Sequence, residues 1–181
     1  RCGPWTFSGP SYTNSTPPPA FISPKDFDRL QPFPSAWATS QENYVPGQVV
    51  PLTRGQASDA RQTGVREPNR VRVLLVDRIP LPDDKELANA ARQSQIITDA
   101  SRAVAIGYGI IIRADSWLNR ELLLHQLVHV AQGERSGGLE SFVSEYLLDR
   151  RSSRDFSLGS LEDEARSLAR EICAGEKIGA A

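Results

Sequence analysis

The sequence predicts an α+β fold: a small twisted sheet packed on one central helix, two further helices and a long Pro-rich N-terminal arm. Three observations predict it. Ten of the 13 prolines lie within residues 1–51, so regular helices and strands are expected only after them. β-branched segments occur at 71–76 and 103–113, and an apolar helical pattern spans 117–134. With 181 residues, 39% of them hydrophobic, the chain suits one domain with a core.

Residues 1–66 are predicted to form a Pro-rich arm and linker packed on the core, and residues 67–181 to form the domain that carries the functional residues. The arm lacks a helical or strand period, and Pro51–Asn69 has the polar composition of a linker or loop. Its aromatic residues favour burial, so we expect an extended wrap. A segment that covers the functional cleft or docks a partner is the alternative. These aromatic residues are Trp5, Phe7, Phe21, Phe27, Phe33 and Trp37.

Two segments are expected to build the sheet. Val71–Val76 is rich in β-branched residues and is followed by two prolines that end it. Ala103–Arg113 is a second strand, broken or turned at Gly107–Gly109. A short helix is expected between them, over 85–95, where apolar residues recur at helical spacing.

Three helices are expected in the remainder of the chain, which contains no proline. Asp115 or Ser116 is expected to cap the first, which should stop at Gly137. The third is expected to begin at Ser160, with Asp163 standing in for the usual glutamate of a capping box. Their expected ranges are 117–134, 139–150 and 160–174.

Composition excludes several classes of protein. The 21 basic and 22 acidic residues are interspersed and give a net charge of −1, so no nucleic-acid partner is expected. No apolar run approaches the ~18 residues of a membrane span. The chain begins with Arg1 and contains no methionine, so we expect a removed leader and a secreted or periplasmic protein. A Cys2–Cys173 disulfide would fit an oxidising compartment, and two unpaired thiols remain the alternative.

The two histidines of the chain, His125 and His129, lie four residues apart within the predicted central helix. Positions i and i+4 lie on one helix face about one turn apart, so both imidazoles can reach a single ion. Apolar residues surround the pair, which indicates a largely buried helix. Buried imidazoles need a partner, and a metal ion is one.

The segment His125–His129, with the sequence HQLVH, resembles the HExxH signature of zinc metallopeptidases. A wider similarity, over roughly residues 70–175, runs from the strand at 103–113 to the acidic segment Leu161–Ala165. It resembles a bacterial group of small gluzincin-like domains whose helix typically reads HELxHVxQ. The resemblance implies a zincin-like fold and one zinc ion. The sequence departs from the family at Gln126, where the family has glutamate.

The resemblance also implies the site. His125 and His129 would be zinc ligands, and gluzincins take a third ligand from a later helix, where the ExxA pattern favours Glu162 over the alternative Glu164. Gln132 would support the site through hydrogen bonds, although a surface glutamine is the default. In zincins the strand before the metal helix commonly forms the sheet edge that aligns a peptide substrate. The resemblance suggests Gly109–Arg113 for this role, and a plain strand of the sheet is the alternative.

Gln126 bears on the mechanism, because an amide cannot take the proton that the family's glutamate accepts from metal-bound water. The expected function is therefore a zinc-dependent endopeptidase domain, acting on a protein or peptide, with impaired catalysis. Tyr146 or Tyr108 could polarise the scissile carbonyl, and packing in the core is the alternative for both. Two explanations stay open: an engineered replacement in an active peptidase, or a native glutamine in a pseudopeptidase. The alternative function is a non-catalytic zinc-binding module of a secreted or envelope assembly, and a third class is a scaffold without metal.

Overall fold

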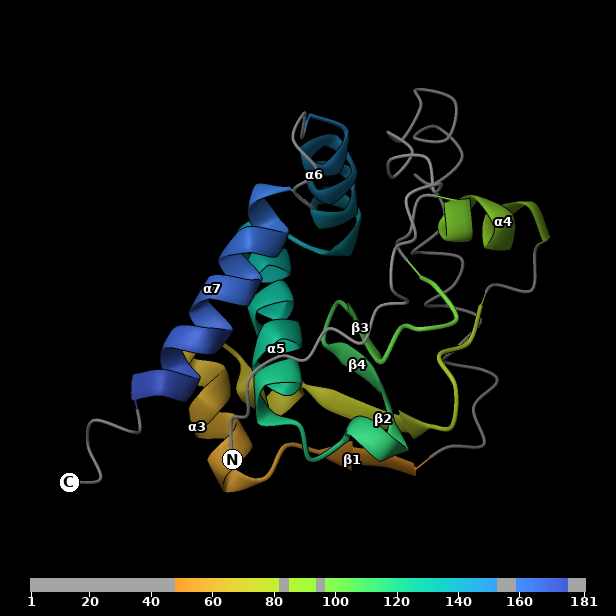
Figure 1. Ribbon diagram of the computed structural model, residues 1–181. Helices are drawn as coiled ribbons and strands as arrows, with labels where there is room; N and C mark the ends of the chain where they lie inside the picture. Colours follow the sequence, from red (N-terminus) through yellow and green to blue (C-terminus); the bar gives the residue numbers. More distant parts are fainter. Residues whose placement is uncertain (1–47, 82–84, 94–96, 153–158, 176–181) are drawn as a thin grey trace.

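The computed structural model describes residues 48–81, 85–93, 97–152 and 159–175 (Figure 1). Most of the predicted N-terminal arm and Cys2 lie outside these residues. Cys173 is buried with Leu124 and Ala169 between two helices. The Cys2–Cys173 bridge therefore stays a prediction.

The sheet is small and mixed, as predicted. Its strand order is β1-β2-β4-β3, with β2 and β4 parallel and the two outer pairs antiparallel. The segment at 103–113 is a hairpin that turns at Gly107, whose φ of 56° favours glycine. The strands are β1 (Gln48–Pro51), β2 (Arg72–Val76), β3 (Ala103–Ile106) and β4 (Gly109–Arg113).

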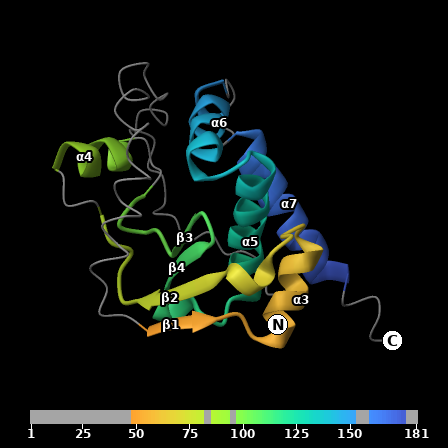
Figure 2. The same ribbon diagram turned by 180° about the vertical axis from the view of Figure 1, so that it is seen from behind.

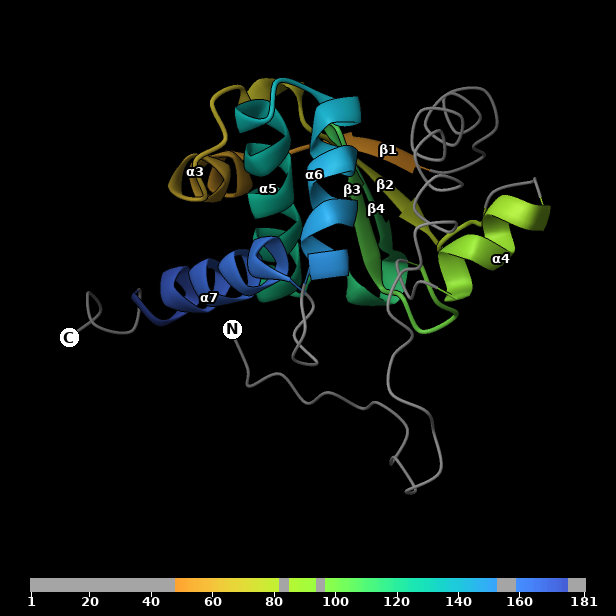
Figure 3. The ribbon, with the colours of Figure 1, turned by 90° about the horizontal axis from the view of Figure 1, so that it is seen from above.

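Five α-helices lie in the described part of the chain. The central one, α5, lies between the sheet and α7, with α6 alongside it (Figures 1 and 3). α4 lies at the other end of the molecule from α3 and α7 (Figure 2). Their bounds are α3 (Arg54–Gln62), α4 (Lys85–Gln93), α5 (Arg120–Arg135), α6 (Leu139–Ser152) and α7 (Ser160–Gly175).

Helix α3 was not predicted, because its Arg- and Gln-rich sequence resembles a loop. A capping box starts it: the Thr53 side chain accepts a hydrogen bond from the Gln56 backbone, and the Gln56 side chain accepts one in return. Its buried Ala60 joins the main core. The buried Asp59 forms an ion pair of 2.7 Å with Arg120, at the first turn of α5. The segment predicted as a linker thus contains a helix that packs on the central helix.

The start of the central helix also differs from the prediction. Residues Ala114–Ser116 form a short 3-10 helix, and α5 begins only at Arg120. The cap is Asn119, whose side chain accepts a hydrogen bond of 2.9 Å from the backbone of Leu122. Asp115 and Ser116 are therefore not its caps.

Alternate residues of the strands face two different clusters. Val73, Ile110 and Ile112 are fully buried against α5. Leu74 and Ile111 face the other side of the sheet, where Leu147 of α6 joins the second cluster. This alternation follows from the period-2 geometry of strands. Packing on its apolar face holds α5 against the sheet and leaves another face for α7.

Candidate metal centre

The described residues contain one group of side chains suited to a metal ion: His125, His129 and Glu162. The histidines lie on the face of α5 that meets α7, and their Nε2 atoms are 3.1 Å apart. Glu162 lies in the first turn of α7. Its two carboxylate oxygens lie 3.3 Å from His125 Nε2 and 3.1 Å from His129 Nε2. Two imidazole nitrogens and the two oxygens of one carboxylate therefore lie close together at the junction of α5 and α7, and one ligand atom from each residue lies within 4.8 Å of the others.

These spacings fit a tetrahedral ion. Two atoms that each lie 2.0–2.1 Å from a tetrahedral zinc are about 3.3–3.4 Å apart. The two Nε2 atoms are 3.1 Å apart, and each lies 3.1–3.3 Å from a different oxygen of the Glu162 carboxylate. His129 and Glu162 are buried, at 8% and 9% exposure. The residues present thus suit a cation with three protein ligands.

Gln132 orients His129. Its Oε1 lies 2.8 Å from His129 Nδ1, and its Nε2 donates to the Leu161 carbonyl and to Glu164 Oε2, both at 2.9 Å. Because both groups contacted by the amide nitrogen are acceptors, the amide cannot be flipped, and Nδ1 must carry the proton. With Nδ1 protonated, a further proton on Nε2 makes the ring an imidazolium that donates to Glu162, and loss of that proton leaves a lone pair on Nε2. The two Nε2 atoms beside one carboxylate can therefore hold either protons or a cation.

The charges of the cluster follow from the same contacts. Burial alone would raise the pKa of Glu162, but hydrogen bonds from His125 and His129 outweigh it and hold the pKa far below its usual range. Burial lowers the pKa of His125. Burial also acts to lower the pKa of His129, but the hydrogen bonds to Glu162 and Gln132 and the nearby carboxylate charges together outweigh it, so that the pKa of His129 is raised. Glu162 therefore stays a carboxylate at neutral pH, as a metal ligand requires.

Glu164, the alternative third ligand, faces away from the imidazoles. Its carboxylate accepts hydrogen bonds from Gln132 and from Arg135, at 2.8 and 2.9 Å. Side chains two positions apart on a helix point about 200° away from each other, so Glu162 and Glu164 cannot both face the cluster. Glu164 instead fixes the amide of Gln132. The sequence analysis did not predict this contact.

Helix α6 positions Glu162 from the other side. The Tyr146 hydroxyl donates to Glu162 Oε1 at 2.7 Å, and its ring lies edge-on to His129 at 6.0 Å. Arg150 donates to the same hydroxyl at 3.3 Å. Burial raises the pKa of Tyr146, so it remains a hydrogen-bond donor. Tyr146 thus holds the carboxylate in this structure, and its role toward a scissile carbonyl stays a prediction.

The first turn of α7 is anchored by Asp149 of α6. One carboxylate oxygen accepts a hydrogen bond from the Ser160 hydroxyl at 2.7 Å, and the other from the Leu161 backbone at 2.9 Å. Gly159, with φ 101°, lets the chain approach closely, since a Cβ there would collide with this carboxylate. The predicted local cap by Ser160 and Asp163 is replaced by one from another helix. No local sequence signal indicates it.

Gln126 is buried, with 5% exposure, and its amide makes no hydrogen bond with any residue that the structure describes. At helical spacing, Gln126 lies on the same face of α5 as Val130 and Gly133. Val130 belongs to the core cluster against which Ala105 of β3 packs. The amide atoms of Gln126 are not among the fully buried atoms that lack a partner, so they keep some solvent contact and are available to a ligand or water.

The edge strand differs from the prediction. Gly109–Arg113 is β4, which pairs with β2 on one side and β3 on the other. The outer side of β3 pairs with no other strand among the described residues. Any strand added beside the metal cluster would therefore pair with β3. Strand order depends on tertiary pairing, which local sequence does not encode.

Tyr108 lies away from the cluster, since its hydroxyl donates to Glu134 Oε1 at 2.9 Å.

None of the helices in the described ranges is long and apolar enough to cross a membrane. Comparison of the chain with protein-family models, with curated proteins and with solved structures found no match, so the function has to be argued from the geometry of His125, His129 and Glu162.

Proposed function

We propose that this chain is a zincin-type, gluzincin-like domain that binds one zinc ion through His125, His129 and Glu162. The observation that carries the proposal is the position of both imidazole Nε2 atoms, 3.1 Å apart, against the two oxygens of the Glu162 carboxylate at 3.1 and 3.3 Å. Two imidazoles and one carboxylate are a donor set that suits zinc, and three protein ligands leave the fourth position for water. When bound, zinc supplies a Lewis acid that activates this water and polarises a carbonyl.

The residues around the three candidate ligands support a peptidase-derived site. Gln132 holds the His129 ring with Nε2 toward His125 and Glu162, and Tyr146 holds the Glu162 carboxylate. A peptide could add to the outer side of β3 by main-chain hydrogen bonds. Protein or peptide substrates are therefore the class that we propose.

Gln126 occupies the position of the general base. Its amide can hydrogen-bond a water molecule or a peptide group, but it has no basic oxygen and cannot accept a proton. General acid–base catalysis contributes about 10²–10⁴-fold to a reaction rate. The domain with Gln126 is accordingly an impaired endopeptidase, whether the glutamine is native or a replacement.

A second function is favoured by the same residue. With Gln126 in the base position, the domain acts as a pseudopeptidase that binds zinc and holds a protein segment without cutting it. A place in a secreted or envelope assembly is consistent with this role. Its zinc would stabilise the junction of α5 and α7 and leave peptide bonds intact.

One experiment separates these functions. The chain is loaded with zinc, its metal content is measured by mass spectrometry, and Gln126→Glu is assayed on unfolded casein. We expect one zinc per chain and a gain in cleavage of about 10²–10⁴-fold over the chain with Gln126. The double variant Gln126→Glu, His129→Ala is the matched control, with the base present and a ligand removed.

Each outcome has a distinct meaning. One bound zinc without cleavage by Gln126→Glu rejects the peptidase and leaves the binding module. A chain that takes up no zinc, and whose melting temperature does not change with a chelator, rejects the metal centre and leaves a scaffold. Cleavage that persists in the double variant comes from a contaminant.

A further inference from the structure

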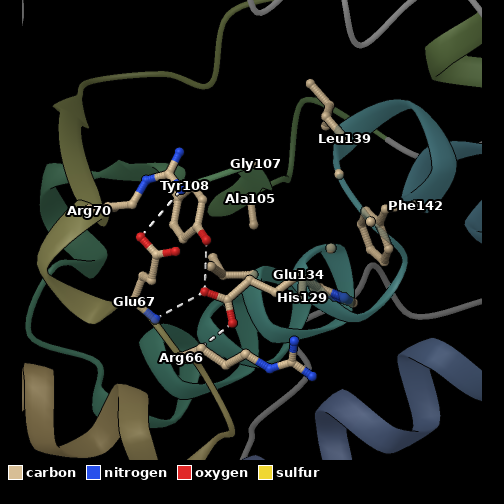
Figure 4. A pocket seen from close by; sticks show the side chains of 14 residues that line it. Arg66, Glu67, Arg70, Ala105, Gly107, Tyr108, His129, Glu134, Leu139 and Phe142 are labelled. Carbon is tan, nitrogen blue, oxygen red and sulfur yellow. Dashed lines mark hydrogen bonds and ion pairs between the residues drawn. The ribbon is translucent and has the colours of Figure 1, made fainter.

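A pocket of about 490 Å³ lies beside His129, within the size range of ligand sites (Figure 4). Its walls come from the C-terminal turns of α5, the start of α6, the β3–β4 turn and residues 66–70. It therefore borders the metal cluster directly. None of the roles assigned above to the site uses it.

One end of the pocket is polar but already satisfied. Glu134 accepts hydrogen bonds from Tyr108 and from the backbone nitrogens of Arg66 and Glu67, at 2.7–3.1 Å. Arg70 lies over the Tyr108 ring at 4.0 Å and pairs with Glu67 at 3.3 Å. A ligand would have to replace these bonds to bind polar groups there, so this end gives little net gain to a charged side chain.

The end beside His129 is apolar. Ala105 projects from β3, while Leu139 and Phe142 project from the first turn of α6 (Figure 4). The Phe142 ring lies 6.2 Å from the His129 ring. These side chains offer no hydrogen-bonding group to a ligand, so binding at this end depends on burial of apolar surface.

A second hollow, of about 520 Å³, lies across the β3–β4 turn. It shares Arg70, Gly107, Tyr108 and Leu139 with the first. Two adjoining hollows with a common wall suit neighbouring side chains of one extended segment better than a single small molecule.

We infer that the pocket beside His129 receives a large apolar side chain, aromatic or branched aliphatic, of the bound peptide, and that Leu139 and Ala105 determine this specificity. The inference rests on the proposed function, because it takes a peptide as the ligand of the metal site. It adds the substrate class that this site selects.

The test uses the zinc-loaded chain with Gln126 in place, so that peptides are bound with little hydrolysis. The probes are blocked pentapeptides of alanine with phenylalanine, leucine, glutamate or lysine at the centre, and affinity is measured by calorimetry. The phenylalanine and leucine peptides should bind roughly 10- to 100-fold more tightly than the others, as expected for burial of one large apolar side chain.

Two variants address the wall. Leu139→Glu places a charge at the apolar end, so the preference for phenylalanine should fall below about threefold and the lysine peptide should gain affinity. Ala105→Leu fills the pocket, so it should weaken binding of the phenylalanine and leucine peptides and leave the affinities of the glutamate and lysine peptides unchanged. The matched control is Leu148→Glu, the same change at a 49% exposed position of α6 that does not line the pocket. It should leave every affinity unchanged.

The failures of the two proposals differ. One zinc per chain with equal affinity for all peptides, or with no peptide bound, overturns the pocket and leaves the metal centre. A preference for phenylalanine that survives both wall variants also overturns it. A chain without zinc that still prefers phenylalanine overturns the metal centre and leaves the pocket.

Discussion

Two faces of α5 are held by different kinds of interaction. Toward the sheet, Leu123, Leu127 and Ala131 pack in an apolar cluster with residues of β2 and β4. Toward α7, His129 and Gln132 make directed contacts of 2.8–3.1 Å with one another and with α7. Apolar packing depends chiefly on buried area, whereas the polar contacts fail when an atom moves by a fraction of an ångström.

The comparison indicates a division of roles along one helix. The sheet side supplies the free energy that keeps α5 in place, and the α7 side sets the positions of the ligand atoms. Changes on the two sides should therefore affect different measurements.

The largest change in stability is expected on the sheet side. Leu127→Ala removes a side chain with 0% exposure, and the free energy of unfolding should fall by about 2–5 kcal/mol, as measured by urea denaturation. Leu148→Ala, at a 49% exposed site, should change it by no more than about 0.5 kcal/mol. The folded fraction of Leu127→Ala should still bind one zinc per chain. Loss of zinc from a variant that remains folded would contradict the division of roles.

A change on the α7 side should act on the metal. Gln132→Leu leaves His129 Nδ1 without its acceptor, and zinc affinity should fall by about 10–100-fold in competition with a chromophoric chelator. Glu164→Gln keeps an acceptor for the Gln132 amide but loses the charge, so its effect should be smaller. Unchanged affinity in Gln132→Leu would show that the amide does not position the imidazole.

The smallest effect is expected from pH, which should change the stabilisation by zinc gradually. In the metal-free chain, the pKa of His129 is raised in the folded state, so protonation of His129 stabilises the fold. This stabilisation is fully present at pH values below the pKa of His129 in the unfolded chain. It is lost as the pH rises through the pKa of His129 in the folded chain. Zinc bound at the proposed site would replace that proton, so we expect stabilisation by zinc to show the opposite pH dependence and to be lost as pH falls. The difference in melting temperature between zinc-loaded and chelated chain should shrink between about pH 8 and pH 5. In His129→Ala the difference should be near zero throughout.

The sequence predicted those parts of the molecule that local patterns encode. The i, i+4 spacing of His125 and His129 predicted that their rings lie together, and the glycines at 107–109 predicted a break or a turn, which the structure shows to be a hairpin. Thr53 and Gln56 form a capping box that was available to predict α3 but was outweighed by the polar composition around it.

Other features depend on contacts between distant segments. β2 pairs in parallel with β4, which leaves β3 at the edge, and no local pattern distinguishes these orders. The cap of α7 comes from Asp149, ten or more residues earlier in the chain. The orientation of Glu164 toward Gln132 likewise became evident only once α5 and α7 were packed together.

Helix α6 contributes to both sites at once. Leu139 and Phe142 line the pocket, while Tyr146 and Asp149 hold the turn that carries Glu162. A small rotation of α6 would alter both the pocket and the position of Glu162. Binding of a peptide in the pocket should therefore change the affinity for zinc, and binding of zinc should change the affinity for the peptide. Thermodynamic reciprocity then requires that zinc and an apolar peptide change each other's dissociation constant by the same factor, in the manner of an effector and its ligand. Titration of the phenylalanine peptide with and without zinc measures that factor, and a value of one would mean that α6 is too rigid to transmit the signal.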